Sequence, residues 1–364
     1  MARIDTIFIN YVGRQFAIRF MAFLTFFIII LQMLDLLNES TAIMAAEGSG
    51  FSSIVKYILL RAPQIATQFA PFAALLSVVV TLTVLNHRSE IAVMRAAGMS
   101  VHRVLFPIGA VCAMIAFAHF AFHEFVTVPS TAKLDYWEAN DFAVDLPEDN
   151  GTRTNLRLDL GDAFIMAGSA ARIGDGARLN NIYIEHLDAD GLITGVTEAA
   201  TAVYTDGRWR LFTVTDHNAE TLRTTSVGEA PWTVDLNPDR LFSLSAQPDR
   251  TTLPELAKEV GLQAESGAAD LASSMTSFLS RFSKPLSTLV MPLLGALAGY
   301  GVSRQGAQLT RAVIGAALGF GYFVFENMAL ALGKLGVIPA FLGAFFPFAL
   351  FMVVGFAILM TMEN

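Results

Sequence analysis

Six long hydrophobic runs divide the chain, three on each side of a polar stretch between residues 128 and 272. Each run holds about 20 residues or more, enough for a helix to cross a hydrocarbon core about 30 Å thick. The pattern predicts an α-helical polytopic membrane protein with six transmembrane helices and an inserted soluble domain. The runs are Phe16–Leu37, Pro63–Leu85, Val101–Val126, Phe278–Tyr300, Ala312–Leu332 and Ile338–Met360.

These runs predict three segments: residues 1–127 with the first three helices, residues 128–272 as the soluble domain, and residues 273–364 with the last three helices. The first run is too long for the hydrophobic region of a signal peptide and lacks a small-residue cleavage site after it. We therefore expect it to be the first membrane span.

The polar stretch carries the turn signals of antiparallel β structure. Asp206-Gly207 separates the strand-like segments Ala202–Thr205 and Arg208–Val214. Asp-Gly and Asn-Gly favour hairpin turns because both residues tolerate positive φ. Asp190-Gly191 and Asn150-Gly151 are two further candidate turns. Short strands at this spacing predict a sandwich or a jelly roll.

A helix is predicted after these strands, over Leu253–Val260. Pro254 stands early in it and Gly261 just past its end, the positions that these residues favour at helix termini. The polar segment Ala264–Ala272 then leads into the fourth hydrophobic run.

Composition and charge separate the two parts of the chain. Apolar residues make up 54% of it, charged residues 15%, and the mean hydropathy is +0.52, too apolar for a soluble domain of this size. Residues 128–272 contain 11 Lys and Arg against 24 Asp and Glu, and the remainder contains 13 against 8. The acidity of the soluble part argues against nucleic acid as a partner.

Basic residues in short loops mark the cytoplasmic side of a membrane protein. They cluster at the N-terminus, after the second run and after the fourth, whereas the loop Asn38–Ser53 has no Lys or Arg. We therefore expect both termini in the cytoplasm and the acidic domain on the other side. Arg281 and Lys284 break the rule, so they need a functional reason or an anionic partner. The conforming residues are Arg3, Arg14, Arg19, Arg88, Arg95, Arg103, Arg304 and Arg311.

Catalytic and cofactor motifs are absent from the sequence. It has no phosphate loop, no H-E-x-x-H and no G-x-S-x-G, so we expect no catalytic residue and no cofactor. His119 and His123 are one helical turn apart and could bind a metal, but no third ligand is evident, and polar tips at an outer helix end are the plainer interpretation. Cys112 lies in a hydrophobic run and is expected to be a packing residue.

The link between the second and third runs, His87–Ser100, has the pattern of a short amphipathic helix. Ile91 and Met94 recur at helical spacing, Glu90 is polar, and Gly98 can end the helix. Such a helix either lies on the membrane surface or docks in a groove of a cytoplasmic partner.

This segment resembles the coupling helix of the lipopolysaccharide-export ABC permeases, the LptF/LptG (YjgP/YjgQ) family. The order of three spans, outward domain and three spans agrees with that family over the whole chain. Further matches are Met33–Leu37 with its Asp35, Arg281–Ser287, and Gly319–Asn327. Asp35 and the last of these stretches resemble the LptG branch more than the LptF branch.

The resemblance implies a multi-pass inner-membrane permease subunit with a periplasmic β-jellyroll domain and no enzymatic activity of its own. Such a subunit extracts lipopolysaccharide from the inner membrane and passes it to a periplasmic bridge toward the outer membrane. The implied partners are an LptB-type ATPase dimer, a partner permease LptF (or LptG), LptC, the periplasmic LptA, lipopolysaccharide and membrane lipid.

The resemblance also suggests site residues. Glu90 falls at the acidic position of the family's coupling motif, and Gln32 stands where family members tend to carry a basic residue near the cavity. The expected ATPase-coupling residues are Arg88, Glu90, Met94, Arg95 and Gly98. The candidates for the lipid A phosphates are Lys56, Arg61, Lys133, Arg281 and Lys284. The polar cavity residues are Gln32, Asp35 and Glu326.

Two alternatives stay open at this point. A lipoprotein-release or FtsX-like permease has four spans, so the count of six argues against it. A polytopic membrane enzyme needs converging ionisable residues, but Asp35, His119, His123, Glu124 and Glu326 stand at helix ends or alone. Glu326 is the most conspicuous of them because a carboxylate inside a membrane is costly; the plainer interpretation is a hydrogen bond to a neighbouring helix through Asn327.

Overall fold

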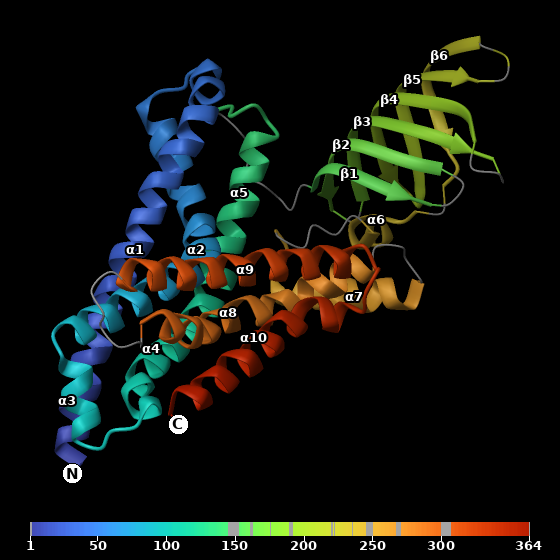
Figure 1. Ribbon diagram of the computed structural model, residues 1–364. Helices are drawn as coiled ribbons and strands as arrows, with labels where there is room; N and C mark the ends of the chain where they lie inside the picture. The colour runs from blue at the N-terminus through green and yellow to red at the C-terminus, as the bar shows by residue number, and fades with distance from the viewer. Residues whose placement is uncertain are drawn as a thin grey trace. The chain divides into compact units, whose positions relative to one another are not determined.

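The computed structural model describes residues 2–144, 153–160, 163–174, 176–188, 192–219, 221, 223–234, 236–244, 250–266, 271–299 and 307–363. The chain forms two compact units (Figure 1). The helical unit consists of Met1–Thr41, Phe51–Thr131 and Ala272–Asn364. The soluble unit consists of Ala42–Gly50 and Ala132–Leu271.

The helical unit is built from long apolar helices. Five described helical stretches are long and apolar enough to cross a membrane: Phe8–Ala45, Phe51–His87, Arg103–Glu138, Val313–Lys334 and Ala340–Ala357. The helices of the N-terminal part are α1 (Ala2–Ala45), α2 (Phe51–His87), α3 (Glu90–Ala96), α4 (Val101–Phe122), the π-helix η1 (His123–Thr127) and α5 (Val128–Glu138). Those of the C-terminal part are α8 (Leu271–Gly299), α9 (Ala307–Lys334) and α10 (Ala340–Glu363).

The predicted fourth span lies in α8 as far as Gly299, and its last residue, Tyr300, lies outside the described residues. With 29 residues α8 is long enough to cross a membrane, but its serines, threonines, Arg281 and Lys284 make it too polar to count among the five apolar stretches. Most of these polar side chains point inward. The buried ones are Ser274, Thr276, Ser277, Ser280, Arg281, Ser283, Ser287 and Thr288.

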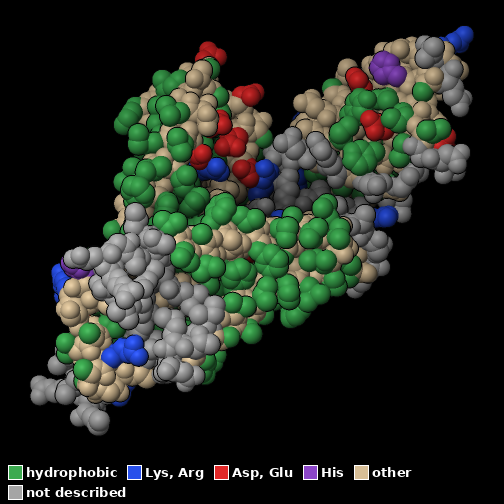
Figure 2. Space-filling model, in the orientation of Figure 1, with side chains coloured by type: hydrophobic (Ala, Val, Ile, Leu, Met, Phe, Trp, Pro, Cys, Tyr) green, Lys and Arg blue, Asp and Glu red, His purple; other side chains and the backbone are tan. Residues whose placement is uncertain are grey.

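Close packing against α2 joins the two halves of the helical unit. A Cβ atom at Gly295 of α8 would lie 2.6 Å from Cγ1 of Val78, and one at Gly319 of α9 would overlap the side chain of Leu75. These glycines therefore let α8 and α9 approach α2 where a larger residue could not. Hydrophobic side chains cover the visible side of α8, α9 and α10 (Figure 2), as expected of helices that face lipid.

The soluble unit is a six-stranded antiparallel sheet in which the strands pair in sequence order. Asp206 and Gly207 form the turn between β4 and β5 with φ of 53° and 78°, as predicted. The candidate turns Asp190-Gly191 and Asn150-Gly151 lie outside the described residues. The strands are β1 (Arg153–Asp159), β2 (Ala163–Ile173), β3 (Gly176–Leu187), β4 (Ile193–Thr205), β5 (Arg208–Asn218) and β6 (Arg223–Trp232).

Two helices follow the sheet, α6 (Pro238–Leu244) and α7 (Leu253–Ser266). The helix predicted at Leu253–Val260 is present, but it continues through Gly261 to Ser266. The predicted end at Gly261 was wrong, because glycine only lowers helix stability by about 1 kcal/mol and does not by itself end a helix.

A crease crosses the whole sheet. Each of the five strand pairs skips a position at the same level, and these positions form one row across all six strands; β3–β4 has a further irregularity at His186 and Leu187. Two residues of this row, Asn181 and Thr213, have left-handed backbones with φ of 52° and 54°. The row consists of Asn155, Gly168, Asn181, Ala200, Thr213 and Gly228.

The side-chain alternation changes face at this crease. In β5, Trp209 and Leu211 are buried before it and Val214 after it, so the buried positions pass from odd to even numbers. Both halves of the strands therefore bury side chains in one core, which α6 completes with Leu241 and Phe242. The domain is thus a creased antiparallel meander, which confirms the predicted antiparallel β class. Its described strands show no Greek-key crossover of the kind that defines a jelly roll.

Candidate functional site

The predicted coupling segment forms a short helix, α3, between two residues with left-handed backbones. Ser89 precedes it with φ 58°, and Gly98 follows it with φ 83°. Ile91 is buried and Met94 packs on the same core of the helical unit, so the predicted apolar side of the helix faces inward.

The other side of α3 is exposed and carries small or flexible side chains. Val93 is 67% exposed, and alanines lie around it. A surface of this kind lets another protein approach the helix backbone closely. The exposed residues of the segment include Arg88, Ala92, Val93, Arg95, Ala96, Ala97 and Gly98.

The carboxylate of Glu90 interacts with two side chains of the same chain, Tyr11 and Arg88. Its Oε1 accepts a hydrogen bond of 3.1 Å from the hydroxyl of Tyr11 and lies 4.0 Å from Nη1 of Arg88. The side chain is still 28% exposed. Glu90 therefore fixes α3 to α1 as well as facing the surface. The sequence pattern did not indicate Tyr11, which lies 79 residues away in the chain.

A second set of interacting polar side chains connects α1 and α2. Nε of Arg61 lies 2.6 Å from Oδ2 of Asp35, and Nη1 of Arg61 donates to Oε1 of Gln64. The structure thus brings together one predicted phosphate-binding residue and one predicted cavity residue. Gln32, three residues before Asp35 in α1, is buried, and both polar atoms of its side chain lack a hydrogen-bond partner among the described residues.

A buried ion pair connects η1 and α8. Nη1 of Arg281 lies 2.7 Å from Oε1 of Glu124 and 3.2 Å from Nδ1 of His123. Arg281 is 4% exposed and Glu124 is 9% exposed. Glu124 is therefore the anionic partner that the position of Arg281 required. His119, His123 and Glu124 do not make up a group of three metal-ligating side chains in the described part of the chain.

Glu326 lies in the core of the helical unit. It is 7% exposed, and its Oε1 accepts a hydrogen bond of 3.2 Å from the hydroxyl of Tyr322, one turn earlier in α9. Lys284 of α8 is close enough to interact with it electrostatically. Asn327 instead donates to the carbonyl of Phe323 in its own helix, so the hydrogen bond of Glu326 comes from Tyr322 rather than from Asn327.

The remaining predicted basic residues are exposed. Lys56 lies on α2, Lys133 on α5 and Lys284 on α8. The five candidates for phosphate contacts therefore divide into three exposed lysines, the half-exposed Arg61 and the buried Arg281.

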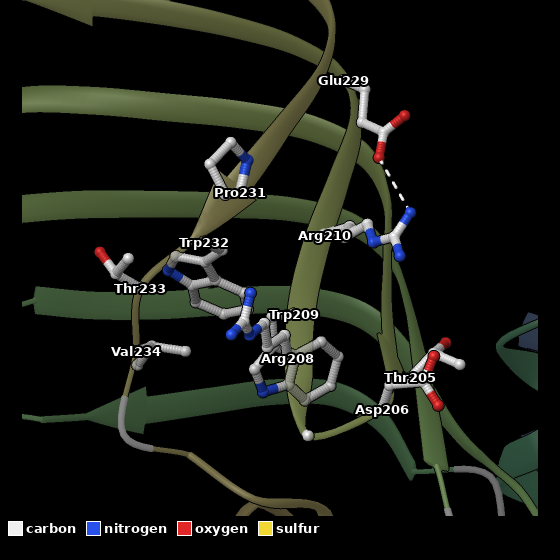
Figure 3. A pocket seen from close by; sticks show the side chains of 11 residues that line it. Thr205, Asp206, Arg208, Trp209, Arg210, Glu229, Pro231, Trp232, Thr233 and Val234 are labelled. Atoms are coloured by element: carbon white, nitrogen blue, oxygen red, sulfur yellow. Dashed lines mark hydrogen bonds and ion pairs between the residues drawn. The ribbon is translucent and has the colours of Figure 1, made fainter.

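The soluble unit has an open hollow of about 960 Å³ between the β4–β5 hairpin and the end of β6 (Figure 3). Trp209 and Trp232 form part of its wall, with ring centroids 5.5 Å apart. Arg210 and Glu229 are paired at 3.4 Å on its rim. The hollow combines an aromatic wall with a charged rim.

Ion pairs fix α7 and the residue Arg250 before it to other elements of the soluble unit. Nη2 of Arg153 in β1 lies 2.8 Å from Oε1 of Glu259 in α7, and Arg250 is paired with Asp135 of α5. Burial raises the pKa of Glu259 to about 7, although the charge of Arg153 opposes the shift. The carboxyl group of Glu259 therefore titrates near neutrality.

Comparison with known proteins agrees with this architecture. The family model for the lipopolysaccharide export system permease LptF/LptG matches residues 10–361. The lipopolysaccharide export system permease protein LptG of Escherichia coli strain K12 is 26% identical over 309 residues, 84% of each chain. The LptG protein of Haemophilus influenzae is 27% identical over 307 residues, 81% of this chain and 82% of the relative. Neither open alternative, the four-span permease or the membrane enzyme, gains support from these matches. Since the match spans nearly the whole sequence, the chain belongs to the LptF/LptG family of lipopolysaccharide export permeases.

Proposed function

We propose that this chain is the LptG-type permease subunit of an inner-membrane ABC transporter, which extracts lipopolysaccharide and passes it to a periplasmic bridge toward the outer membrane. The observation that carries the proposal is the family match over residues 10–361. The subunit is a transport protein and not an enzyme, so ATP hydrolysis belongs to a separate partner.

The helix α3 is the proposed contact with that partner, an LptB-type ATPase dimer in the cytoplasm. The exposed small residues around Val93 offer a docking surface, and the bond between Glu90 and Tyr11 connects that surface to α1. A movement of the ATPase against α3 would then reach the first membrane helix directly. We propose with it that both termini lie in the cytoplasm and the soluble unit in the periplasm.

We further propose that α8 also crosses the membrane, as the fourth of six spans along the chain. Its 29 residues suffice to cross the bilayer, and its polar side chains are buried within the protein rather than presented to lipid. Its outward end carries Arg281 and Lys284. Of these, Lys284 is the better candidate for a lipid A phosphate because its side chain is exposed, whereas Arg281 is buried.

The soluble unit is the proposed periplasmic docking domain. Within the described sheet, β1 and β6 are the edge strands, and most of β6 is exposed. Edge strands pair readily with a strand from another protein. We propose that the creased sheet joins the jellyroll-type path formed with the partner permease LptF, LptC and LptA, in which the apolar interior receives acyl chains.

The proposal is tested with two matched variants of the chain expressed with its partners. Val93→Glu puts a charge on the proposed docking surface of α3, whereas Val337→Glu puts the same charge on the turn between α9 and α10, where the side chain is equally exposed at 67%. Co-purification of the ATPase and lipopolysaccharide-stimulated ATP hydrolysis are measured. We expect loss of both with Val93→Glu and retention with Val337→Glu. Full ATPase binding by Val93→Glu would contradict the docking assignment.

A further inference from the structure

An arginine lies inside the first hydrophobic run, toward the end of the helical unit that carries α3. Arg19 is three residues into the run Phe16–Leu37 and is half-buried. An ionisable side chain within a membrane span is costly and calls for a partner. Its hydrogen bonds go to neutral groups of Gln15 and Thr81: the carbonyl of Gln15 at 3.0 Å, its Oε1 at 2.9 Å, and Oγ1 of Thr81 at 3.4 Å. None of these groups neutralises the charge of Arg19.

The same bonds turn the guanidinium toward the membrane surface. Gln15 stands about one helical turn before Arg19, nearer the start of α1, and long basic side chains in membrane helices extend toward the headgroups in this way. A guanidinium has five N–H donors, and no described residue accepts a hydrogen bond from Nε of Arg19. Arg19 is therefore oriented by its neighbours and can still donate to an acceptor from outside the chain.

A second arginine places the same charge nearby. Arg88 follows His87, the last residue of α2, and it acts on Arg19 as a repelling like charge. Its side chain is 61% exposed. Among the described side chains, these two guanidinium groups have one carboxylate within ion-pair distance, that of Glu90, which is 4.0 Å from Arg88 and also accepts the hydrogen bond from Tyr11. The excess positive charge favours an anion beside the two arginines.

The depth of the two arginines selects the kind of anion. Arg19 lies within an apolar run and Arg88 just past the end of another, so their guanidinium groups lie at the boundary between hydrocarbon and headgroups. Tyr11 is 42% exposed beside them, and tyrosine is typical of this boundary. A phosphodiester offers acceptor oxygens that suit a guanidinium. A zwitterionic headgroup brings a cation that the arginines repel, so the site favours a headgroup with net negative charge.

We propose that Arg19 and Arg88 form a binding site for the phosphate of an anionic glycerophospholipid in the leaflet next to α3. The ligand is a lipid of the surrounding membrane and not the transported glycolipid. The inference rests on the proposed function in one respect, since the cytoplasmic placement of α3 makes this the inner leaflet. The bound phosphate offsets the repulsion between the two arginines, and it connects Arg88, at the start of the α3 segment, to α1.

The test is a titration of the complete transporter, in neutral detergent, with phosphatidylglycerol, and the retained lipids are counted by native mass spectrometry. Arg19→Gln should lower the affinity for one lipid per complex roughly ten- to a hundredfold, as expected for a lost charge-assisted hydrogen bond. Arg88→Gln should act in the same direction, and the exposure of Arg88 means that this variant should fold normally. Full retention of the lipid by either variant would overturn the site.

The matched control is Arg14→Gln. Arg14 is exposed and stands five residues before Arg19 in α1, about 140° around the helix, so the control removes the same charge from the same end of the molecule. It should retain the lipid. General attraction to a basic surface predicts instead equal losses of about fivefold for each arginine removed, and that result would contradict a specific site. Displacement of the lipid by millimolar inorganic phosphate would assign the site to a free anion rather than to a headgroup and overturn the proposal.

The same proteins separate this proposal from the proposed function. Lipopolysaccharide-stimulated ATP hydrolysis is measured in nanodiscs. Normal stimulation of the unaltered complex, with equal retention of phosphatidylglycerol by all variants, would overturn the lipid site and leave the transport function intact. Absence of stimulation, with selective loss of the lipid in Arg19→Gln and Arg88→Gln, would contradict the transport function and support the lipid site.

Discussion

The crease in the soluble unit offers a sharp test of the fold. Thr213 is exposed, lies in the row of skipped register positions, and has a left-handed backbone with φ 54°. A β-branched residue is poorly suited to this conformation. Thr213→Gly should therefore stabilise the strand pair β4–β5 although it removes a side chain.

The size of the effect follows from two opposing terms. The left-handed conformation costs an L-residue about 1–2 kcal/mol, and glycine avoids this cost. Glycine loses more chain entropy on folding, which costs about 0.5–1 kcal/mol. The side chain is exposed, so little buried surface is lost. The net stabilisation is about 0.5–1 kcal/mol, or roughly a two- to fivefold smaller population of the locally opened state.

Hydrogen exchange of the full-length protein measures this directly. Amides of β4 and β5 should exchange about two- to fivefold more slowly in Thr213→Gly. The control is Thr215→Gly, two residues further along β5, where Thr215 pairs with Glu198 and Ser226. Glycine at this paired position should accelerate exchange by weakening the strand. Faster exchange in both variants alike would refute the role assigned to the crease.

Three further predictions concern other parts of the molecule. The folded-state pKa of Glu259 lies above its ordinary value, so folding binds a proton between about pH 4.5 and 7. The exchange protection of α7 should therefore fall as the pH rises from 5 to 8, and Glu259→Gln should remove that dependence. Gly319→Ala should destabilise the helical unit by about 1–3 kcal/mol through overlap with Leu75, measured as a lower melting temperature. Gly321→Ala should leave the melting temperature unchanged, because no neighbouring atom lies within 4 Å of its new Cβ. Tyr11→Phe should loosen α3 and reduce coupling of ATP hydrolysis to lipopolysaccharide without preventing ATPase binding; an unchanged coupling ratio would show that the bond to Glu90 transmits nothing.

The helical layout was largely predictable from sequence because a hydrophobic run of this length is typical of a membrane-spanning helix. The hydropathy signal was weakest for α8. Its polar residues face the protein interior, so its hydropathy is lower than that of a helix exposed to lipid on all sides. Periodicity predicted the apolar face of α3 correctly, since Ile91 and Met94 both pack inward.

Long-range pairing was not predictable. The pairs Glu90–Tyr11, Asp35–Arg61 and Glu124–Arg281 join residues 26 to 157 positions apart, and nothing in a local pattern selects such partners. The crease could not be predicted from the sequence for a different reason. Strand prediction relies on strict alternation, and the change of face at Thr213 interrupts that alternation within one strand.

The central claim, that the chain moves lipopolysaccharide, is tested most directly by reconstituting it with its ATPase and partner permease in lipopolysaccharide-containing vesicles. The measurement is transfer of lipopolysaccharide to a soluble periplasmic acceptor after addition of ATP. We predict transfer that requires both ATP and this chain. ATP hydrolysis by the assembled complex with no more transfer than from vesicles lacking the chain would contradict the account.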